Sequence, residues 1–164
     1  MCDHCGCRTL TPVARLMAEH DQLRELSGRI QHALARQDDA TARSLFSEVL
    51  VVLGPHTAKE DRALFPMLRG EEELAEHVDV LEGEHADLYD TVDDLTDPAA
   101  EADLPAWRAG VLELLRHLDQ HMFKEDFGLF PAAIATLDGD DWDAVDRWER
   151  EHGGTATTPV QSRA

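Results

Sequence analysis

The stretch HTAKEDRALFP at residues 56–66 has a close copy, HMFKEDFGLFP, at residues 121–131. Seven of the eleven positions are identical, and the two copies begin 65 residues apart. In each copy a histidine stands four residues before a glutamate. Residues four apart on an α-helix are separated by only about 40° of rotation, so the imidazole and the carboxylate of each copy lie on one helix face. The repeat therefore indicates two helices that each present one histidine and one glutamate.

The rest of the chain also has helical periodicity. Apolar residues recur at spacings of three and four in four long segments, which begin near residues 11, 39, 71 and 103. A shorter amphipathic segment covers residues 141–151, and no stretch alternates in the manner of a β-strand. Gly54-Pro55 is predicted to interrupt the second helix with a kink, because Pro55 has no N–H to donate to the carbonyl of Val51. Short connections then predict an all-α fold, an up-down-up-down four-helix bundle with a short fifth C-terminal helix.

Histidines and glutamates stand in the apolar stripes of these helices. His20 lies between Leu16 and Leu23, and His85 fills the one gap in the stripe of the third helix. The polar residues in the stripes are His20, His56, Glu60, His85, His121 and Glu125. A single buried histidine is usually a hydrogen-bonded core residue. Two buried carboxylates without a compensating cation would each cost several kcal/mol, however, so the set as a whole predicts bound metal.

Six ligands from four helices exceed the four that close a tetrahedral zinc site. We therefore expect two metal ions, each bound by two histidines and bridged by Glu60 and Glu125. Mixed nitrogen and oxygen ligands suit iron, with manganese or zinc as alternatives. About four protein ligands per ion would leave positions open on an octahedral metal, where dioxygen, peroxide, nitric oxide or water could bind.

On these residues the chain resembles the hemerythrin-like family of HHE cation-binding domains. The resemblance covers residues 11–152 and depends on the six stripe residues and on the Leu-Phe-Pro that follows each pair. Ferritin-like bundles use a different order, Glu-x-x-His. The resemblance implies a non-haem di-iron centre, which Glu60 and Glu125 bridge together with an oxo or hydroxo group.

Two features separate the chain from the oxygen-carrying members of that family. Those members have a further histidine one turn before the ligand of the third helix, where this chain has Leu81. They also have an aspartate five residues after the last histidine, where this chain has Glu125 after four. Four histidines and two glutamates are more similar to the pattern of bacterial iron-sulphur cluster repair and related stress-response proteins.

The resemblance thus implies a protein that binds or reacts with O2, H2O2 or nitric oxide in oxidative or nitrosative stress, or in iron-sulphur repair. Whether the centre turns over a substrate is left open at this point. The alternative functions are an oxygen or iron sensor and an iron-buffering binding module.

Two further residues could face the centre. Tyr89 lies one turn after His85, and His117 lies one turn before His121. Tyr89 could be a ligand, hydrogen-bond a bound oxygen species or simply pack. His117 is a possible ligand but is expected rather to hydrogen-bond a ligand from outside or to lie at the helix surface. An aspartate directly follows three of the stripe residues: Asp21, Asp61 and Asp126. All three are expected on a solvated face, with a hydrogen bond from one of them to a ligand histidine as the alternative.

All three cysteines lie at the N-terminus, in the sequence MCDHCGC. An odd number in so short a segment does not describe a disulfide framework. A separate metal or redox site is one interpretation, and a passive tail with reactive thiols is the other; its residues are Cys2, His4, Cys5 and Cys7. A functional tail could also contact a protein partner.

The composition is strongly acidic, with 34 Asp and Glu against 15 Lys and Arg and a formal net charge of −19. This charge disfavours nucleic acid and anionic membranes as partners. No apolar run has the length of a transmembrane helix or the pattern of a signal peptide, so we expect a cytoplasmic protein. The expected organisation is a Cys-rich tail at residues 1–10, the hemerythrin-like bundle at 11–152 and a disordered tail at 153–164. The oligomeric state does not follow from the sequence.

Overall fold

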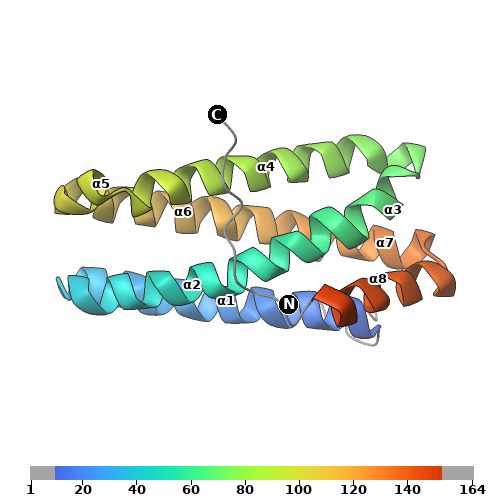
Figure 1. Cartoon of the computed structure of the whole chain (residues 1–164), viewed down its shortest axis with the longest axis horizontal. Helices are drawn as coiled ribbons and strands as arrows, with labels where there is room; N and C mark the ends of the chain where they lie inside the picture. The colour runs from blue at the N-terminus through green and yellow to red at the C-terminus, as the bar shows by residue number, and fades with distance from the viewer. Residues whose placement is uncertain (1–9, 153–164) are drawn as a thin grey trace.

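Two antiparallel pairs of long helices form the bundle (Figure 1). In the computed structural model, which describes residues 10–152, the first pair is α1 (Thr11–Ala35) and α2 (Asp39–Lys59). The second pair is α4 (Glu72–Thr96) and α6 (Leu104–Lys124). The chain runs up and down in turn through these four helices, and residues 10–152 contain no β-strand. The predicted all-α fold is therefore confirmed.

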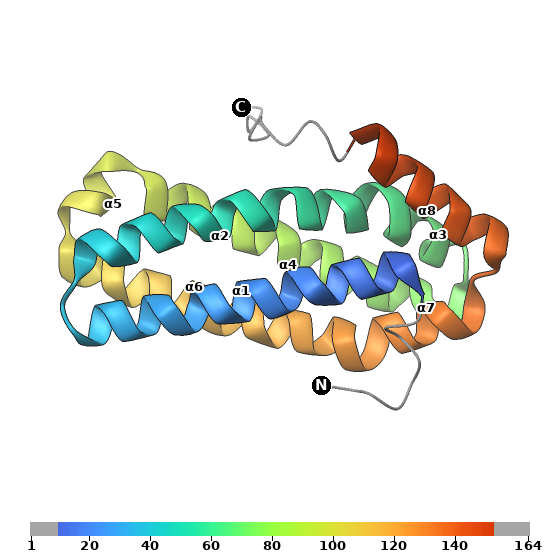
Figure 2. The same ribbon diagram turned by 90° about the horizontal axis from the view of Figure 1, so that it is seen from below.

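Shorter helices complete the bundle at its two ends. At one end α5 (Pro98–Ala102) connects α4 to α6. At the other end lie α3 (Phe65–Arg69), α7 (Phe130–Thr136) and α8 (Gly139–His152). The last of these is the predicted fifth helix, and it packs against α1 and α2 (Figure 2).

A π-helical turn follows α2, and a second one follows α6. These turns are η2 (Glu60–Leu64) and η3 (Glu125–Leu129), so each begins at a glutamate of the repeated stretch. In η2 the N–H of Phe65 donates to the carbonyl of Glu60, five residues back. A proline follows this phenylalanine in each copy, Pro66 in the first and Pro131 in the second, and proline has no N–H to donate to the preceding turn. The π-helical turn therefore lies next to a position where one backbone hydrogen bond of the α-helix is missing.

Helix α2 continues through Gly54-Pro55 as one helix, so the predicted interruption does not divide it in two. Pro55 removes one backbone donor from this turn. The hydroxyl of Thr57 donates to the carbonyl of Leu53 at 3.1 Å and so adds a side-chain donor in the same turn. The helix continues because the surrounding turns and packing compensate for the one missing bond.

The two halves of the chain are structurally equivalent with an offset of 65 residues. Asp38 caps α2 by accepting from the N–H of Thr41, and Asp103 caps α6 by accepting from the N–H of Ala106. Helices α2 and α6 both have 21 residues, and both lead into a five-residue π-turn. The repeated stretch is thus the most conspicuous part of a duplication that includes whole helices.

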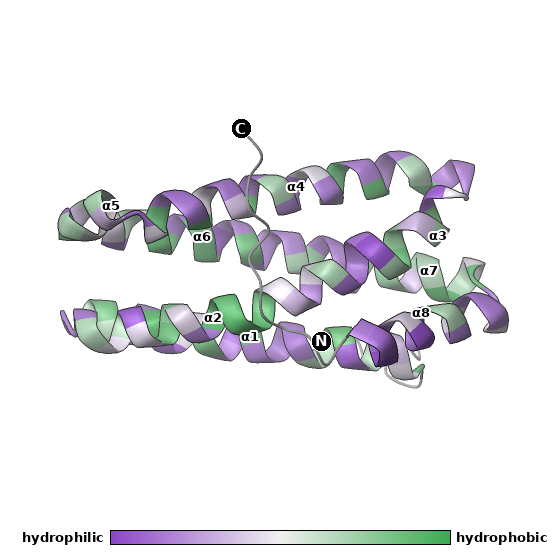
Figure 3. Cartoon of the chain, in the orientation of Figure 1, coloured by the Kyte–Doolittle hydropathy of each residue, from purple (hydrophilic) through white to green (hydrophobic). Residues whose placement is uncertain are grey.

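The core consists of two apolar clusters with a polar layer between them. One cluster includes Leu23, Ile30 and Trp107, and the other includes Leu16, Phe65 and Phe130. His20 lies on α1 between Leu16 and Leu23, which belong to different clusters. Figure 3 shows the polar residues mainly on the outward faces of the helices, so a polar layer inside the bundle is an exception to the general pattern. Within residues 10–152, every helix is too short or too polar to cross a membrane.

Candidate metal centre

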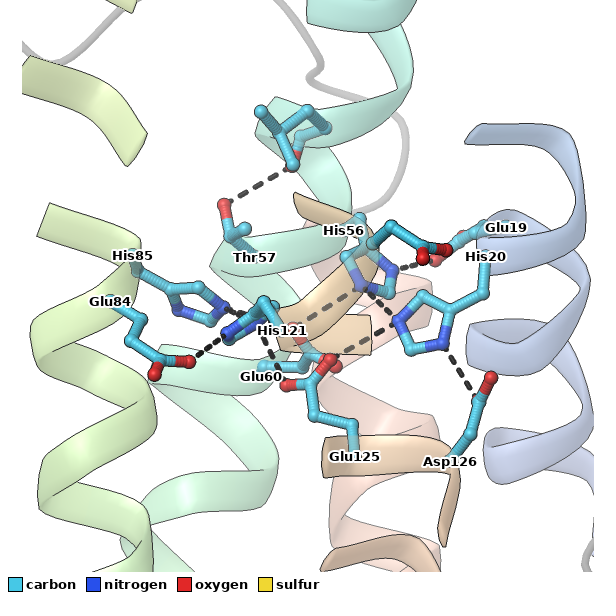
Figure 4. A network of polar contacts seen from close by, with 12 residues as sticks. Glu19, His20, His56, Thr57, Glu60, Glu84, His85, His121, Glu125 and Asp126 are labelled. Carbon is cyan, nitrogen blue, oxygen red and sulfur yellow. Dashed lines mark hydrogen bonds and ion pairs between the residues drawn. The ribbon is translucent and has the colours of Figure 1, made fainter. Parts of the chain in front are cut away.

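The polar layer brings together the six predicted stripe residues. Two groups of four have potential ligand atoms within 4.8 Å of one another, and both groups are buried. The first group consists of His20, His56, Glu60 and Glu125, and the second of Glu60, His85, His121 and Glu125. The two glutamates belong to both groups. In Figure 4 the imidazole rings approach the glutamates from α1, α2, α4 and α6.

The four imidazoles form two pairs. The Nε2 atoms of His20 and His56 are 2.9 Å apart, and those of His85 and His121 are 2.8 Å apart. Two nitrogen lone pairs at this distance repel each other, so each pair needs either a proton or a cation between its nitrogens. One pair comes from each half of the duplicated chain.

The two glutamates lie between the imidazole pairs and are fully buried. All four of their carboxylate oxygens lack a hydrogen-bond partner among the described residues. Glu60 Oε2 lies 3.3 Å from His56 Nε2 and 3.5 Å from His85 Nε2. Glu125 lies 3.2 Å from His20 Nε2 through one oxygen and 3.2 Å from His121 Nε2 through the other. Each glutamate therefore reaches both imidazole pairs, as a bridging ligand must.

Every imidazole is held from outside by a carboxylate at its other nitrogen. The Nδ1 atom of His20 bonds Asp126 at 2.8 Å, and that of His85 bonds Asp61 at 2.7 Å. The equivalent contacts in the other two helices are His56 to Glu19 at 2.8 Å and His121 to Glu84 at 3.0 Å. When Nδ1–H donates to a carboxylate, the lone pair remains on Nε2, which here points inward. The outer carboxylates thus orient all four rings for ligation.

Aromatic rings cover the centre from one side. Phe130 stacks on His20, and Phe65 stacks on His85, each with ring centroids 5.5 Å apart. Both phenylalanines are fully buried and belong to the Leu-Phe-Pro that ends each repeated stretch. They restrict water access and hold the two rings flat.

Burial and mutual contacts shift the pKa values within the cluster in opposite directions. Burial and the facing Glu125 raise the pKa of Glu60 well above its ordinary range. Burial also acts on Glu125, but His121 and His20 hold its pKa well below the ordinary range. Burial opposes the charged form of His20, yet its hydrogen bond to Asp126 and the adjacent Glu125 carboxylate raise its pKa to about 9. Without a cation, protons therefore occupy this cluster, and metal binding must displace them.

Burial has the opposite outcome at His56, where desolvation lowers the pKa to about 4 despite the bond to Glu19. This imidazole is neutral at physiological pH and free to donate its lone pair. In the absence of a cation, His20 is therefore the more basic imidazole of the first pair, and its Nε2 lies 2.9 Å from Nε2 of His56, within hydrogen-bond distance.

Tyr89 and His117, the two further residues that the sequence suggested near the centre, lie in different surroundings. The hydroxyl of Tyr89 is 2.6 Å from Thr57 Oγ1, beside the ligand level, and the residue is 37% exposed. His117 is not brought to the cluster: its side chain is half-exposed on α6 and lies 3.1 Å from Glu113. The N-terminal Cys2, His4, Cys5 and Cys7, and the tail at 153–164, lie outside the described residues.

Sequence reasoning missed the outer partners Glu19 and Glu84 and treated Asp61 and Asp126 as solvated by default. The two aspartates instead accept from His85 and His20, which was the alternative interpretation. A signal for the glutamates was present in the sequence. Each immediately precedes a cluster histidine, as Glu-His at residues 19–20 and again at residues 84–85. That dipeptide repeats with the same 65-residue offset as the longer stretch.

The donor set fits a pair of cations. Six residues supply the donor atoms, and the two glutamates belong to both groups of four. The four oxygens of these glutamates have no hydrogen-bond partner in the described part of the chain. Two cations would neutralise both carboxylates and replace the protons between the imidazole nitrogens. The fold and this site define a cation-binding helical bundle.

Comparison with known proteins gives the family. The model of the hemerythrin HHE cation binding domain matches residues 11–133, and the chain belongs to this family. Two curated relatives are iron-sulfur cluster repair proteins named YtfE. The protein from Edwardsiella ictaluri is 33% identical over 116 residues, which cover 63% of this chain and 48% of the relative. The protein from Musicola paradisiaca is 32% identical over 139 residues, 77% of this chain and 59% of the relative.

The chain therefore spans about half to three fifths of the length of these relatives. No solved structure matches the chain significantly.

Proposed function

We propose that the protein binds two iron ions at the buried cluster and uses them to react with peroxide, dioxygen or nitric oxide in stress response or iron-sulphur cluster repair. The observation that carries this proposal is the group of four unpartnered oxygens of Glu60 and Glu125 between two inward-facing imidazole pairs. The names of the two curated relatives support the repair context.

The ligand roles follow from the distances. His20 and His56 would hold one ion, His85 and His121 the other, and both glutamates would bridge them. Manganese or zinc would fit the same donors, but zinc has no redox chemistry, and the mixed nitrogen and oxygen set suits iron best. When bound, the irons would supply open coordination positions and redox capacity.

The residues around the cluster have separate tasks. Asp61 and Asp126 orient His85 and His20 and support their basicity through the Nδ1 bonds. Phe65 and Phe130 exclude water from one side of the centre. With only two imidazoles for each ion, small molecules have room to bind directly at the metals.

A metal analysis with a matched pair of histidine variants tests the proposal. We expect about two irons per chain in the aerobically purified protein and consumption of peroxide or nitric oxide by the loaded protein. His121→Ala should lose iron and this activity. His117→Ala is the control, because His117 lies one turn away on the same helix but on its exposed face.

Three results would change the interpretation. Loss of iron in both variants would point to helix damage rather than to ligation. Two irons without turnover would favour a binding or sensing module. A single zinc per chain that His121→Ala leaves in place would refute the di-iron centre.

A further inference from the structure

The 65-residue duplication places different residues at two equivalent positions beside the centre. Arg24 lies four residues after His20, and its equivalent Tyr89 lies four residues after His85. Arg24 Nη2 donates to Asp126 at 2.7 Å, so a guanidinium caps the carboxylate that holds His20. Tyr89 instead bonds Thr57 at 2.6 Å. Among the described residues, the other half of the chain therefore has no equivalent of the guanidinium cap.

This difference leaves the two outer aspartates in unequal environments. The side chain of Asp126 is 6% exposed and bonds both His20 and Arg24. The side chain of Asp61 is 28% exposed, and its one hydrogen bond within the described residues goes to His85. The carboxylate behind His20 thus has a cation partner, whereas the carboxylate behind His85 has no Lys or Arg partner in the described part of the chain.

Arg24 also lies near two other carboxylates, but these do not cancel its effect. Asp119 is 3.5 Å away and Asp21 is 3.9 Å away. Asp119 is 69% exposed, so water screens its charge far better than that of the buried Asp126. The guanidinium therefore acts mainly on the buried carboxylate.

The lysines of the two halves differ in the same sense. Lys59 is 5% exposed and contacts Glu19, behind His56, at 2.8 Å and Glu149 of α8 at 3.0 Å. Its equivalent Lys124 contacts Glu84, behind His121, but is 44% exposed because α8 covers only the first half. Behind His20 and His56, each outer carboxylate thus has a cation partner, Arg24 with a side chain 33% exposed and Lys59 with one 5% exposed. Behind His85, Asp61 has no Lys or Arg partner among the described residues, and behind His121, Glu84 has the more exposed Lys124.

We propose that the two cation positions are inequivalent, and that the position of His85 and His121 binds a divalent cation first and more tightly than the position of His20 and His56. This inference rests on the proposed two-cation centre. An uncompensated carboxylate behind His85 attracts the cation and makes the imidazole a stronger donor. The capping guanidinium of Arg24 repels the cation and withdraws charge from Asp126. Asp61 and Arg24 are therefore positioning residues that set the affinities of the two positions in opposite directions.

Titration of the metal-free full-length protein with Co²⁺, followed by its visible absorption, tests this order. The wild-type protein should bind two equivalents in two phases, with dissociation constants that differ on the order of 10- to 100-fold, the usual effect of an outer hydrogen-bond partner. His121→Ala should lose the tighter phase, and His56→Ala should keep it. These two variants assign each phase to a position.

Two outer-shell variants then test the cause. Asp61→Asn should weaken only the tighter phase, by roughly 10- to 100-fold. Arg24→Gln should lower the dissociation constant of the weaker phase and so reduce the difference between the two constants. A gain in affinity cannot come from damage to the fold, so Arg24→Gln separates an electrostatic effect from a structural one. Thermal melting of both metal-free variants checks that the bundle is intact.

Several results would overturn the inference. Equal constants in the wild-type protein would do so, as would loss of the tighter phase in His56→Ala rather than His121→Ala. A weakened second phase in Arg24→Gln would remove the electrostatic explanation. In all three cases two cobalt ions still bind, so the proposed centre stands. Binding of fewer than two equivalents to the wild-type protein would refute the proposed centre and this inference with it.

Discussion

Replacing Glu60 and Glu125 singly by glutamine should have very unequal effects on the stability of the metal-free protein, although both residues are buried bridging candidates. Burial and the neighbouring Glu125 raise the pKa of Glu60 well above its ordinary range, so Glu60 is the glutamate of the pair that holds a proton more readily. Glutamine matches a protonated carboxyl group in size and shape. We therefore expect Glu60→Gln to change the free energy of unfolding by less than about 1 kcal/mol in the absence of metal.

Glu125 is the ionised member of the pair. His121 and His20, at 3.2 Å from its two oxygens, hold its pKa well below the ordinary range against the effect of burial. Removing one partner of a buried charge pair costs about 3 kcal/mol or more. In a chain of 164 residues each kcal/mol corresponds to about 2–4 °C in Tm, so metal-free Glu125→Gln should melt about 6–12 °C below the wild-type protein.

The assay is thermal unfolding in a chelator and again with added metal. Metal at 100 times its Kd should stabilise the wild-type protein by about 2.7 kcal/mol, or about 5–11 °C, and both variants should lose most of this shift. Glu48→Gln is the control, because Glu48 is exposed on α2, and it should behave as the wild-type protein does. Equal melting of both metal-free variants, or a full metal-dependent shift in either, would refute the assigned charge states or the bridging role.

Three further predictions concern pH, the core and α8. The pKa of His20, raised from 6.5 to about 9, gives the metal-free fold about 3 kcal/mol that is fully present below pH 6.5 and lost as the pH rises to 9. Melting at pH 6.5 and 9 should show this loss, while metal affinity rises over the same window because the metal displaces the proton. Leu114→Ala, in the apolar cluster that includes Trp107, should cost about 2–5 kcal/mol in urea unfolding at unchanged metal stoichiometry; a cost below 1 kcal/mol would contradict the packing. Lys59→Met should leave Glu149 without its buried partner, so hydrogen exchange should quicken in α8 while α4 remains protected.

The helices and the composition of the cluster could be predicted because both depend on periodicity. Polar residues such as His20 and His85 stand out when they replace apolar ones at regular spacing along a stripe. Burial of six such residues from four helices at one level then follows from bundle geometry. The structure places all six together.

The remaining features depend on contacts between helices, which periodicity does not encode. Glu19 and Glu84 lie beside the stripe, and their bonds to His56 and His121 come from packing of neighbouring helices. The π-turns depend on local hydrogen-bond competition next to proline, and no apolar pattern distinguishes them from α-helix. His117 shows that helical spacing alone is also not sufficient. It lies one helical turn from His121, yet its side chain is on the exposed edge of α6.

Each group of four donors draws on both halves of the duplicated chain, since neither half supplies both Glu60 and Glu125. A cation at either position is therefore a cross-link between two helical hairpins that are otherwise joined mainly through side-chain packing. The two effects are reciprocal. If separation of the hairpins lowers the cation affinity by a given factor, loss of the cation weakens the association of the hairpins by the same factor. Cation binding at the centre and association of the two hairpins are therefore coupled, and a measurement of either one reports on the other.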